Sequence, residues 1–253
     1  MILKECFFNA NGAYKAAERI KPVGIVVHST GCDNEMLRRY VQPTTANADA
    51  KAVLTDLGKN MYNNHHNQEY INGVYNDICM HAYIGCNDKG TVEVYHTLPY
   101  NFACWGCGSG SKGSYNYAPY PHIQFEICED SLNNKAYFDK VFNAAIEYCA
   151  YLCKKLNIDV ENIVSHKEAA KAGYASNHGD PENWLEKYGK NMDWFRAQVK
   201  NKLKTTTDAT KTKVIYRVQV GAYENYDNAK AFLETVKKAG FTNAFIMKVE
   251  VEK

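Results

Sequence analysis

The chain has 253 residues, of which 45% are hydrophobic and 23% are charged, and its formal net charge is +2. These values are ordinary for a soluble globular protein that buries a substantial core. The small net charge gives no strong attraction to nucleic acid or to a membrane surface, and no run of eighteen apolar residues predicts a membrane span. We therefore expect neither nucleic acid nor membrane as a partner.

The predicted elements alternate between strands and helices along the first two hundred residues. Residues 23–30 indicate a buried strand, and residues 77–99 indicate two strands joined by a turn at Asn87 to Gly90. Residues 122–130 alternate as a further strand. Residues 134–157 carry apolar side chains at the three- and four-residue spacing of an amphipathic helix. This order predicts an α/β fold with a mixed central sheet flanked by helices.

The pattern changes near the C-terminus. We expect a catalytic domain over 1–203, and threonine and lysine then dominate residues 204–212, as in a solvated linker. Residues 213–253 follow as a small strand–helix–strand (βαβ) unit, whose helix Asn225 or Asp227 could cap. About forty residues give too little core for stability alone, so this unit is expected to dock on the main domain or to pair with another copy.

The N-terminus and the cysteines bear on where the protein is made. The apolar start of the chain is interrupted by Lys4 and Glu5 and lacks the basic-then-apolar order of a signal peptide, so we expect synthesis and retention in a cytoplasm. Nine cysteines cannot all pair within one chain. The CWGC run at 104–107 has no second CxxC for a zinc knuckle, so its thiols are interpreted as small buried hydrophobes.

Two distant stretches carry histidines that ordinary packing does not require. His28 ends the apolar strand in VVHST, His166 lies in SHKE, and Asp180 lies in the loop SNHGDP. Two neutral imidazoles and a carboxylate form a set that can hold a catalytic zinc and leave a position for water. On residue types alone, each histidine is more often a surface or hydrogen-bonded residue than a ligand, and the spacing is no compact zinc motif.

Four stretches in consistent order resemble the zinc-dependent N-acetylmuramoyl-L-alanine amidases, the type shared by phage endolysins and peptidoglycan recognition proteins. They are KPVGIVVHSTG, GTVEVYHTLP, HIQFEICED and SHKEAAKAGYASNHGDPENW. The resemblance implies that His28, His166 and Asp180 bind Zn²⁺ and that Glu126 lies beside the activated water. The expected activity is hydrolysis of the amide bond between N-acetylmuramic acid and the L-alanine of the stem peptide, with Glu126 moving a proton from water to the leaving amine. Without the resemblance, Glu126 reads as a solvated strand residue.

Two positions depart from the family pattern. His178 stands where many relatives have a lysine that stabilises the oxyanion, and a protonated imidazole offers a donor and a positive charge for the same role. Gly106, in WGCGSG, stands where relatives often have a histidine. Substrate contacts are expected instead from a second group: His81, Trp105 and Asn177. Trp105 could instead be a core residue that contacts no substrate.

The remaining histidines, His65, His66 and His96, are interpreted as surface or packing residues. Residues 216–246 resemble the sporulation-related repeat, which binds peptidoglycan strands and normally contains two strand–helix–strand halves. Only one half is present, so we expect a homodimer through residues 213–253, with a loosely docked tail as the alternative.

The whole pattern implies a phage or prophage endolysin, made in the bacterial cytoplasm and acting on the cell wall after release, with bacterial peptidoglycan as its partner. A bacterial autolysin stays open. A non-catalytic recognition module is disfavoured because all three candidate ligands and Glu126 are present. A cysteine peptidase is disfavoured because no cysteine stands at a helix start beside a supported base.

Overall fold

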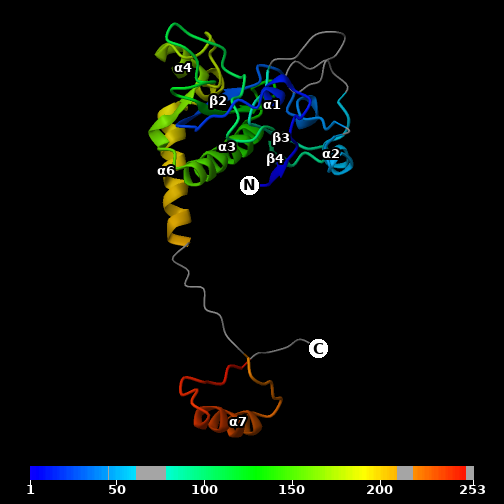
Figure 1. The fold of residues 1–253 in the computed structure, drawn as a ribbon, viewed down its shortest axis with the longest axis vertical. Helices are drawn as coiled ribbons and strands as arrows, with labels where there is room; N and C mark the ends of the chain where they lie inside the picture. Colours follow the sequence, from blue (N-terminus) through cyan, green and yellow to red (C-terminus); the bar gives the residue numbers. More distant parts are fainter. Residues whose placement is uncertain (45, 61–77, 210–218, 249–253) are drawn as a thin grey trace. The chain divides into compact units, whose positions relative to one another are not determined.

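The computed structural model describes residues 1–44, 46–60, 78–209 and 219–248, and Figure 1 shows its fold. The chain forms two compact units, Met1–Ala209 and Thr210–Lys253, which are treated separately below. Within the described residues, no helix combines the length and the hydrophobicity needed to cross a membrane.

The first unit is built on a six-stranded sheet with strand order β1-β4-β3-β5-β2-β6. Only the β3–β4 pair is antiparallel, and every other neighbouring pair is parallel, which confirms the predicted mixed sheet. The strands are β1 (Leu3–Glu5), β2 (Gly24–Ser29), β3 (Ala82–Cys86), β4 (Val92–His96), β5 (His122–Ile127) and β6 (Ile163–Ser165).

The antiparallel pair is a hairpin whose turn chemistry is visible in the sequence. The side-chain oxygen of Asn87 accepts from the backbone N–H groups of Lys89 and Thr91, each at 3.0 Å. Gly90 adopts a φ of 74°, a conformation that residues with a Cβ rarely take. The hairpin predicted around these residues is therefore confirmed.

One face of the sheet is covered by the long helix α3 (Lys135–Leu156), which confirms the predicted amphipathic helix. It begins where the Asn134 side chain accepts from the backbone of Tyr137, and it ends at Asn157 in the left-handed conformation. Its apolar stripe packs on the inward-facing residues of β4, β3 and β5, and helix α6 (Met192–Ala209) lies beside it (Figure 1).

The opposite face carries a second, aromatic-rich core that includes Phe8, Tyr40, Tyr83 and Tyr95. Because both faces are covered, all six residues of β2 and all six of β5 are buried, polar ones included. The other helices are α1 (Gly12–Ala16), η1 (Leu37–Arg39), α2 (Ala50–Leu57), η2 (Val160–Asn162), α4 (His166–Ala172), α5 (Glu182–Lys187) and α7 (Tyr226–Lys238).

The C-terminal segment differs from its expectation in two ways. Helix α6 continues to Ala209, so the first part of the expected linker, 204–209, is helical. In the second unit, α7 forms with Asn225 as its N-cap, but the described parts of the two expected strands, 219–223 and 244–248, form no strand. A strand needs a partner, and a single half-domain offers too little sheet and core to supply one. The rest of both expected strands lies outside the described residues.

Candidate metal centre

The central strands bring the predicted site residues together. Strands β2 and β5 run parallel in a register that pairs His28 with Glu126, so both side chains leave the sheet on the same face at the ends of their strands. Strand β6 pairs with the other side of β2 and ends at Ser165. His166, the next residue, is therefore delivered to the same edge.

The start of α4 holds His166 in place. Ser165 and Glu168 form a capping box: the Ser165 hydroxyl accepts from the Glu168 N–H at 2.9 Å, and the Glu168 carboxylate accepts from the Ser165 N–H at 3.1 Å. The guanidinium of Arg196, on α6, donates to both carboxylate oxygens of Glu168, at 2.9 and 3.1 Å. The backbone at His166 is thereby fixed from two helices.

The three predicted ligands converge. The Nδ1 atoms of His28 and His166 lie 3.0 Å apart, and Asp180 places Oδ2 3.4 Å from the first and Oδ1 3.5 Å from the second. The Ser29 N–H donates to the Asp180 carboxylate at 3.2 Å and steadies it. A tetrahedral ion ~2.0–2.1 Å from each ligand atom needs those atoms about 3.3 Å apart, so the spacing suits one metal ion.

The protonation states of these groups also suit a metal. Burial lowers the pKa of His166 to about 4, with the neighbouring His28 acting in the same direction, so its imidazole is neutral at pH 7. Burial alone would raise the pKa of Asp180, but the contact with the His28 side chain and the hydrogen bond from the Ser29 N–H hold it below its ordinary value. Two neutral imidazoles and one carboxylate are the donor set that Zn²⁺ prefers.

Glu126 lies on the same face and is only 5% exposed. Among the described residues, its Oε2 atom has no hydrogen-bond partner. Burial raises its pKa well above the ordinary value, and the charges of Asp180 and Glu129 raise it further. A buried carboxylate without a partner is costly, so the interpretation as a solvated strand residue is wrong and a functional position is favoured.

His178 and Asn177 lie on the exposed loop that leads to Asp180. The Nδ1 atom of His178 lies 3.3 Å from both the His166 Nε2 atom and the Ser176 hydroxyl. The Ser176 hydroxyl donates to the Cys107 carbonyl at 3.2 Å, and its oxygen lies 3.3 Å from His166 Nε2. The structure thus brings His178 to the ligand cluster, while no contact of the Asn177 side chain is observed among the described residues.

His81 does not line a groove. Its side chain is fully buried, its Nδ1 accepts from the Gln124 N–H at 3.0 Å, and its Nε2 faces the Phe102 carbonyl at 3.0 Å. Burial lowers its pKa to about 3. His81 therefore ties β5 to the segment that follows β4 and presents no surface to a substrate, which corrects the expectation for this residue.

Trp105 is half-buried and packs at the edge of the aromatic core, so part of its ring stays accessible. Beside it, Gly106 has a physical reason to lack a side chain. A Cβ atom there would lie 2.4 Å from the Met80 sulfur and 2.6 Å from the Gln124 side-chain oxygen. The histidine that relatives carry at this position does not fit in this packing.

The other histidines and the thiols take structural places. His96 stacks on Tyr100 with ring centroids 3.9 Å apart, in keeping with a packing role, and His65 and His66 lie outside the described residues. All nine cysteines are free. Burial raises the pKa of eight of the nine thiols, which suppresses the thiolate that a nucleophilic cysteine requires.

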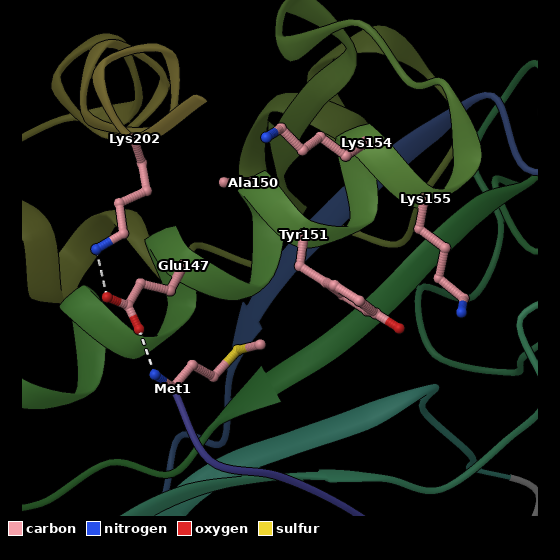
Figure 2. Close-up of a pocket in the computed structure, with 7 residues that line it drawn as sticks. All are labelled: Met1, Glu147, Ala150, Tyr151, Lys154, Lys155 and Lys202. Atoms are coloured by element: carbon pink, nitrogen blue, oxygen red, sulfur yellow. Dashed lines mark hydrogen bonds and ion pairs between the residues drawn. The ribbon is translucent and has the colours of Figure 1, made fainter. Parts of the chain in front are cut away.

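A surface pocket of about 490 Å³ lies elsewhere, between α3 and α6. Figure 2 shows Glu147 there, between the ammonium group of Lys202 and the amino group of Met1. None of the predicted site residues lines it. The lining residues are Met1, Glu147, Ala150, Tyr151, Lys154, Lys155 and Lys202.

The sheet, its helices and the His–His–Asp cluster form a candidate metal centre on an α/β scaffold. The family model described as N-acetylmuramoyl-L-alanine amidase matches residues 18–183, and the SPOR domain model matches residues 187–248. The chain therefore belongs to the N-acetylmuramoyl-L-alanine amidase family and carries a SPOR domain, so it is a peptidoglycan amidase. This confirms the resemblance drawn from the sequence motifs. A comparison with curated protein sequences gave no match.

The chain is also similar to several solved structures. The hydrolase AmiA of Staphylococcus aureus, solved with its ligand, is 16% identical, with a TM-score of 0.52 over 82% of this chain and 86% of that one. A mutant endolysin from Bacillus subtilis is 24% identical over 79% of this chain and 99% of that one, with a TM-score of 0.45. The PlyG catalytic domain is 19% identical over 80% and 96% of the two chains, with a TM-score of 0.48.

Sequence reasoning missed three polar residues around the cluster: Gln124, Asn116 and Ser176. Gln124 and Asn116 are buried, and each of the three makes side-chain hydrogen bonds in the network behind the histidines. In the sequence, Gln124 shows only as the polar partner in an alternating strand. Its burial depends on the loop that covers that face, which no local pattern reveals.

Proposed function

We propose that this amidase depends on Zn²⁺ held by His28, His166 and Asp180. The observation that carries the proposal is the convergence of two Nδ1 atoms and a carboxylate within 3.0–3.5 Å, since neutral nitrogens and a carboxylate facing one another favour a bound cation. Zn²⁺ bound there supplies a Lewis acid that activates water near neutral pH.

Glu126 is the proposed general base. Its unpartnered oxygen is available to accept the proton of the attacking water and then to deliver that proton to the leaving amine of L-alanine. Nearby positive charge from a bound ion favours the ionised form of Glu126 and opposes the effect of burial.

His178 is the proposed stabiliser of the oxyanion that forms on the cleaved amide. Its exposed ring lies beside His166, at the rim of the cluster, where a substrate carbonyl has access. In its protonated form the imidazole donates a hydrogen bond and carries a positive charge. Trp105 and Asn177, each with accessible surface, are proposed to contact the glycan or the stem peptide.

The test uses purified peptidoglycan and measures newly released L-alanine amino termini. We expect release by the metal-loaded protein, loss with a chelator, recovery with Zn²⁺, and loss in Asp180→Ala. Cleavage that persists in chelator would contradict the zinc proposal and favour a cysteine nucleophile. Binding to peptidoglycan without any cleavage would favour the non-catalytic recognition module.

The C-terminal part is proposed to hold the enzyme on its substrate, with a catalytic domain over 1–203, a linker over 204–212 and a wall-binding half-domain over 213–253. In the described part, α7 buries none of its residues, and Tyr226 and Phe241 are 67% and 68% exposed. A second copy would cover such a surface, which supports the proposed homodimer. Sedimentation of the full chain against a chain ending at Ala209 tests this: two monomeric species would exclude the pairing.

The cellular setting is proposed to be that of a phage or prophage endolysin, with a bacterial autolysin as the alternative. The combination of an amidase with a SPOR domain supports action on the cell wall in either case. Expression in a bacterial host with and without a membrane-permeabilising agent distinguishes them. An endolysin produces lysis only after permeabilisation, whereas an exported autolysin acts without it.

A further inference from the structure

A buried chain of amide groups lies behind the first zinc ligand. Gln124, on β5, is fully buried. Its side-chain oxygen lies 3.1 Å from His28 Nε2, and its side-chain nitrogen donates to the Asn116 oxygen at 2.8 Å. His28 therefore faces the ligand cluster with one ring nitrogen and this amide chain with the other.

Backbone N–H groups determine which way the hydrogen bonds run along these two side-chain amides. The Asn116 side-chain oxygen accepts from the backbone N–H groups of Gly106 and Cys107, each at 3.3 Å. A backbone N–H can only donate, so the oxygen of Asn116 must point at these groups. Gln124 then has to offer its NH₂ group to Asn116, which leaves its oxygen for His28.

The consequence for His28 concerns its tautomer. Two acceptors face the His28 ring: the Gln124 oxygen 3.1 Å from Nε2 and the Asp180 carboxylate 3.4 Å from Nδ1. The shorter contact favours the ring proton on Nε2, which leaves Nδ1 with a lone pair on the side of His166 and Asp180. That is the form of the imidazole that binds a metal ion.

We propose that Gln124, oriented by Asn116, is a positioning residue that fixes His28 in its metal-binding tautomer and thereby raises the affinity for Zn²⁺. This inference rests on the proposed metal site. The backbone N–H of Gln124 donates to His81 Nδ1 at 3.0 Å, which fixes the strand at this position. Gly106 leaves room for the side-chain amide, since a Cβ there would lie 2.6 Å from the amide oxygen.

The first experiment measures Zn²⁺ affinity, by competition with a fluorescent chelator, in the full chain. Gln124→Met keeps the side-chain length and removes the acceptor, so we expect affinity to fall about 10–100-fold. Gln124→Glu keeps an acceptor for His28 but loses the NH₂ group that Asn116 orients, so it should recover only part of the affinity. The matched control is Gln42→Met, the same substitution at a half-buried glutamine that bonds Val41 and Gly58, and it should leave the affinity unchanged.

The second experiment reads the tautomer directly in the metal-free protein, through long-range ¹H–¹⁵N correlations of the His28 ring. The wild type should show the Nε2–H form, and Gln124→Met a mixture. Asn116→Leu removes the partner of the Gln124 NH₂ group and lets the amide turn. We expect it to lower the Zn²⁺ affinity and to give a mixture of His28 tautomers, as Gln124→Met does. It replaces Gln124→Met if that variant does not fold.

The outcomes separate the two proposals. Equal Zn²⁺ affinity in wild type and Gln124→Met, with the tautomer unchanged, would overturn the role of Gln124 while the metal site stands. Absence of Zn²⁺ binding by the wild type would overturn the metal site, and the tautomer measurement would then decide alone whether Gln124 orients His28.

Discussion

At the scale of single residues, the site contains a buried polar atom that has no hydrogen-bond partner among the described residues. Glu126 has a buried oxygen without a described partner, and the neighbouring charges of Asp180 and Glu129 disfavour its ionised form. Such an arrangement costs stability, and proteins retain it where a ligand or a reaction compensates for the cost.

Replacing Glu126 by glutamine should separate chemistry from metal binding. We expect Glu126→Gln to lower the rate of amide cleavage about 10²–10⁴-fold, because the side chain loses its basicity while its size is kept. The Zn²⁺ content should not change, since Glu126 is no ligand. Glu186→Gln, at an exposed position of α5, removes the same charge outside the site and should leave the rate unchanged. A Glu126→Gln enzyme with the wild-type rate would exclude the base.

Gly106 should tolerate no side chain. In Gly106→Ala the new Cβ would collide with the Met80 sulfur and the Gln124 oxygen, and we expect a loss of about 1–3 kcal/mol in unfolding free energy, measured by denaturant titration. Gly179→Ala is the control, because no atom lies within 4 Å of a Cβ there. Equal stability of both variants would show that the packing around Gly106 gives way easily.

At the scale of elements, the helix start at His166 couples stability to the metal site. The Ser165 hydroxyl caps α4 and also donates to Glu182 at 2.5 Å, so one side chain joins α4 to α5 directly behind a ligand. The position of His166 therefore depends on a cap.

Ser165→Ala should cost about 1–2 kcal/mol of unfolding free energy and also weaken Zn²⁺ binding. Asn134→Ala removes the cap of α3, which carries no site residue, and should cost a similar amount of stability without changing the affinity for Zn²⁺. Chemical unfolding and chelator competition on both variants check the pair. Unchanged affinity in Ser165→Ala would mean that the cap supports the helix but not the ligand.

The elements that could be predicted are those whose signals are local. The spacing in α3, the apolar run of β2 and the turn at Asn87 are each set by neighbouring residues. The strands expected around α7 need partners outside the half-domain, and the burial of Gln124 and His81 comes from loops distant in sequence. The three ligands were assigned from family resemblance, because no spacing in the chain indicates that they meet.

At the scale of the whole molecule, we expect the first unit to carry the amidase activity and the second to bind peptidoglycan. Removal of residues 210–253 should leave cleavage of a soluble muropeptide unchanged and lower cleavage of intact peptidoglycan, because a tether raises the local enzyme concentration only on a polymer. Parallel assays on both substrates check this. If a chain ending at Ala209 degrades intact peptidoglycan as fast as the full chain, residues 210–253 do not tether the enzyme to its substrate.

The buried histidines should make the fold sensitive to acid. The pKa of His81 is lowered to about 3, so between pH 6.5 and 3 the unfolded chain binds a proton that the folded chain does not, and stability falls as pH falls. At pH 5 this single group costs about 2 kcal/mol relative to pH 7. Urea titrations at both pH values, in chelator, should show a smaller loss in His81→Gln. Parallel pH dependences would contradict the assignment.

The pairing of β6 with β2 joins residues about 138 positions apart and brings the candidate ligands His28 and His166 together. A polypeptide that ends before Ile163 lacks His166 and Asp180, two of the three candidate ligands. We therefore expect peptidoglycan cleavage only from a chain that extends through Asp180, the last of the three candidate ligands.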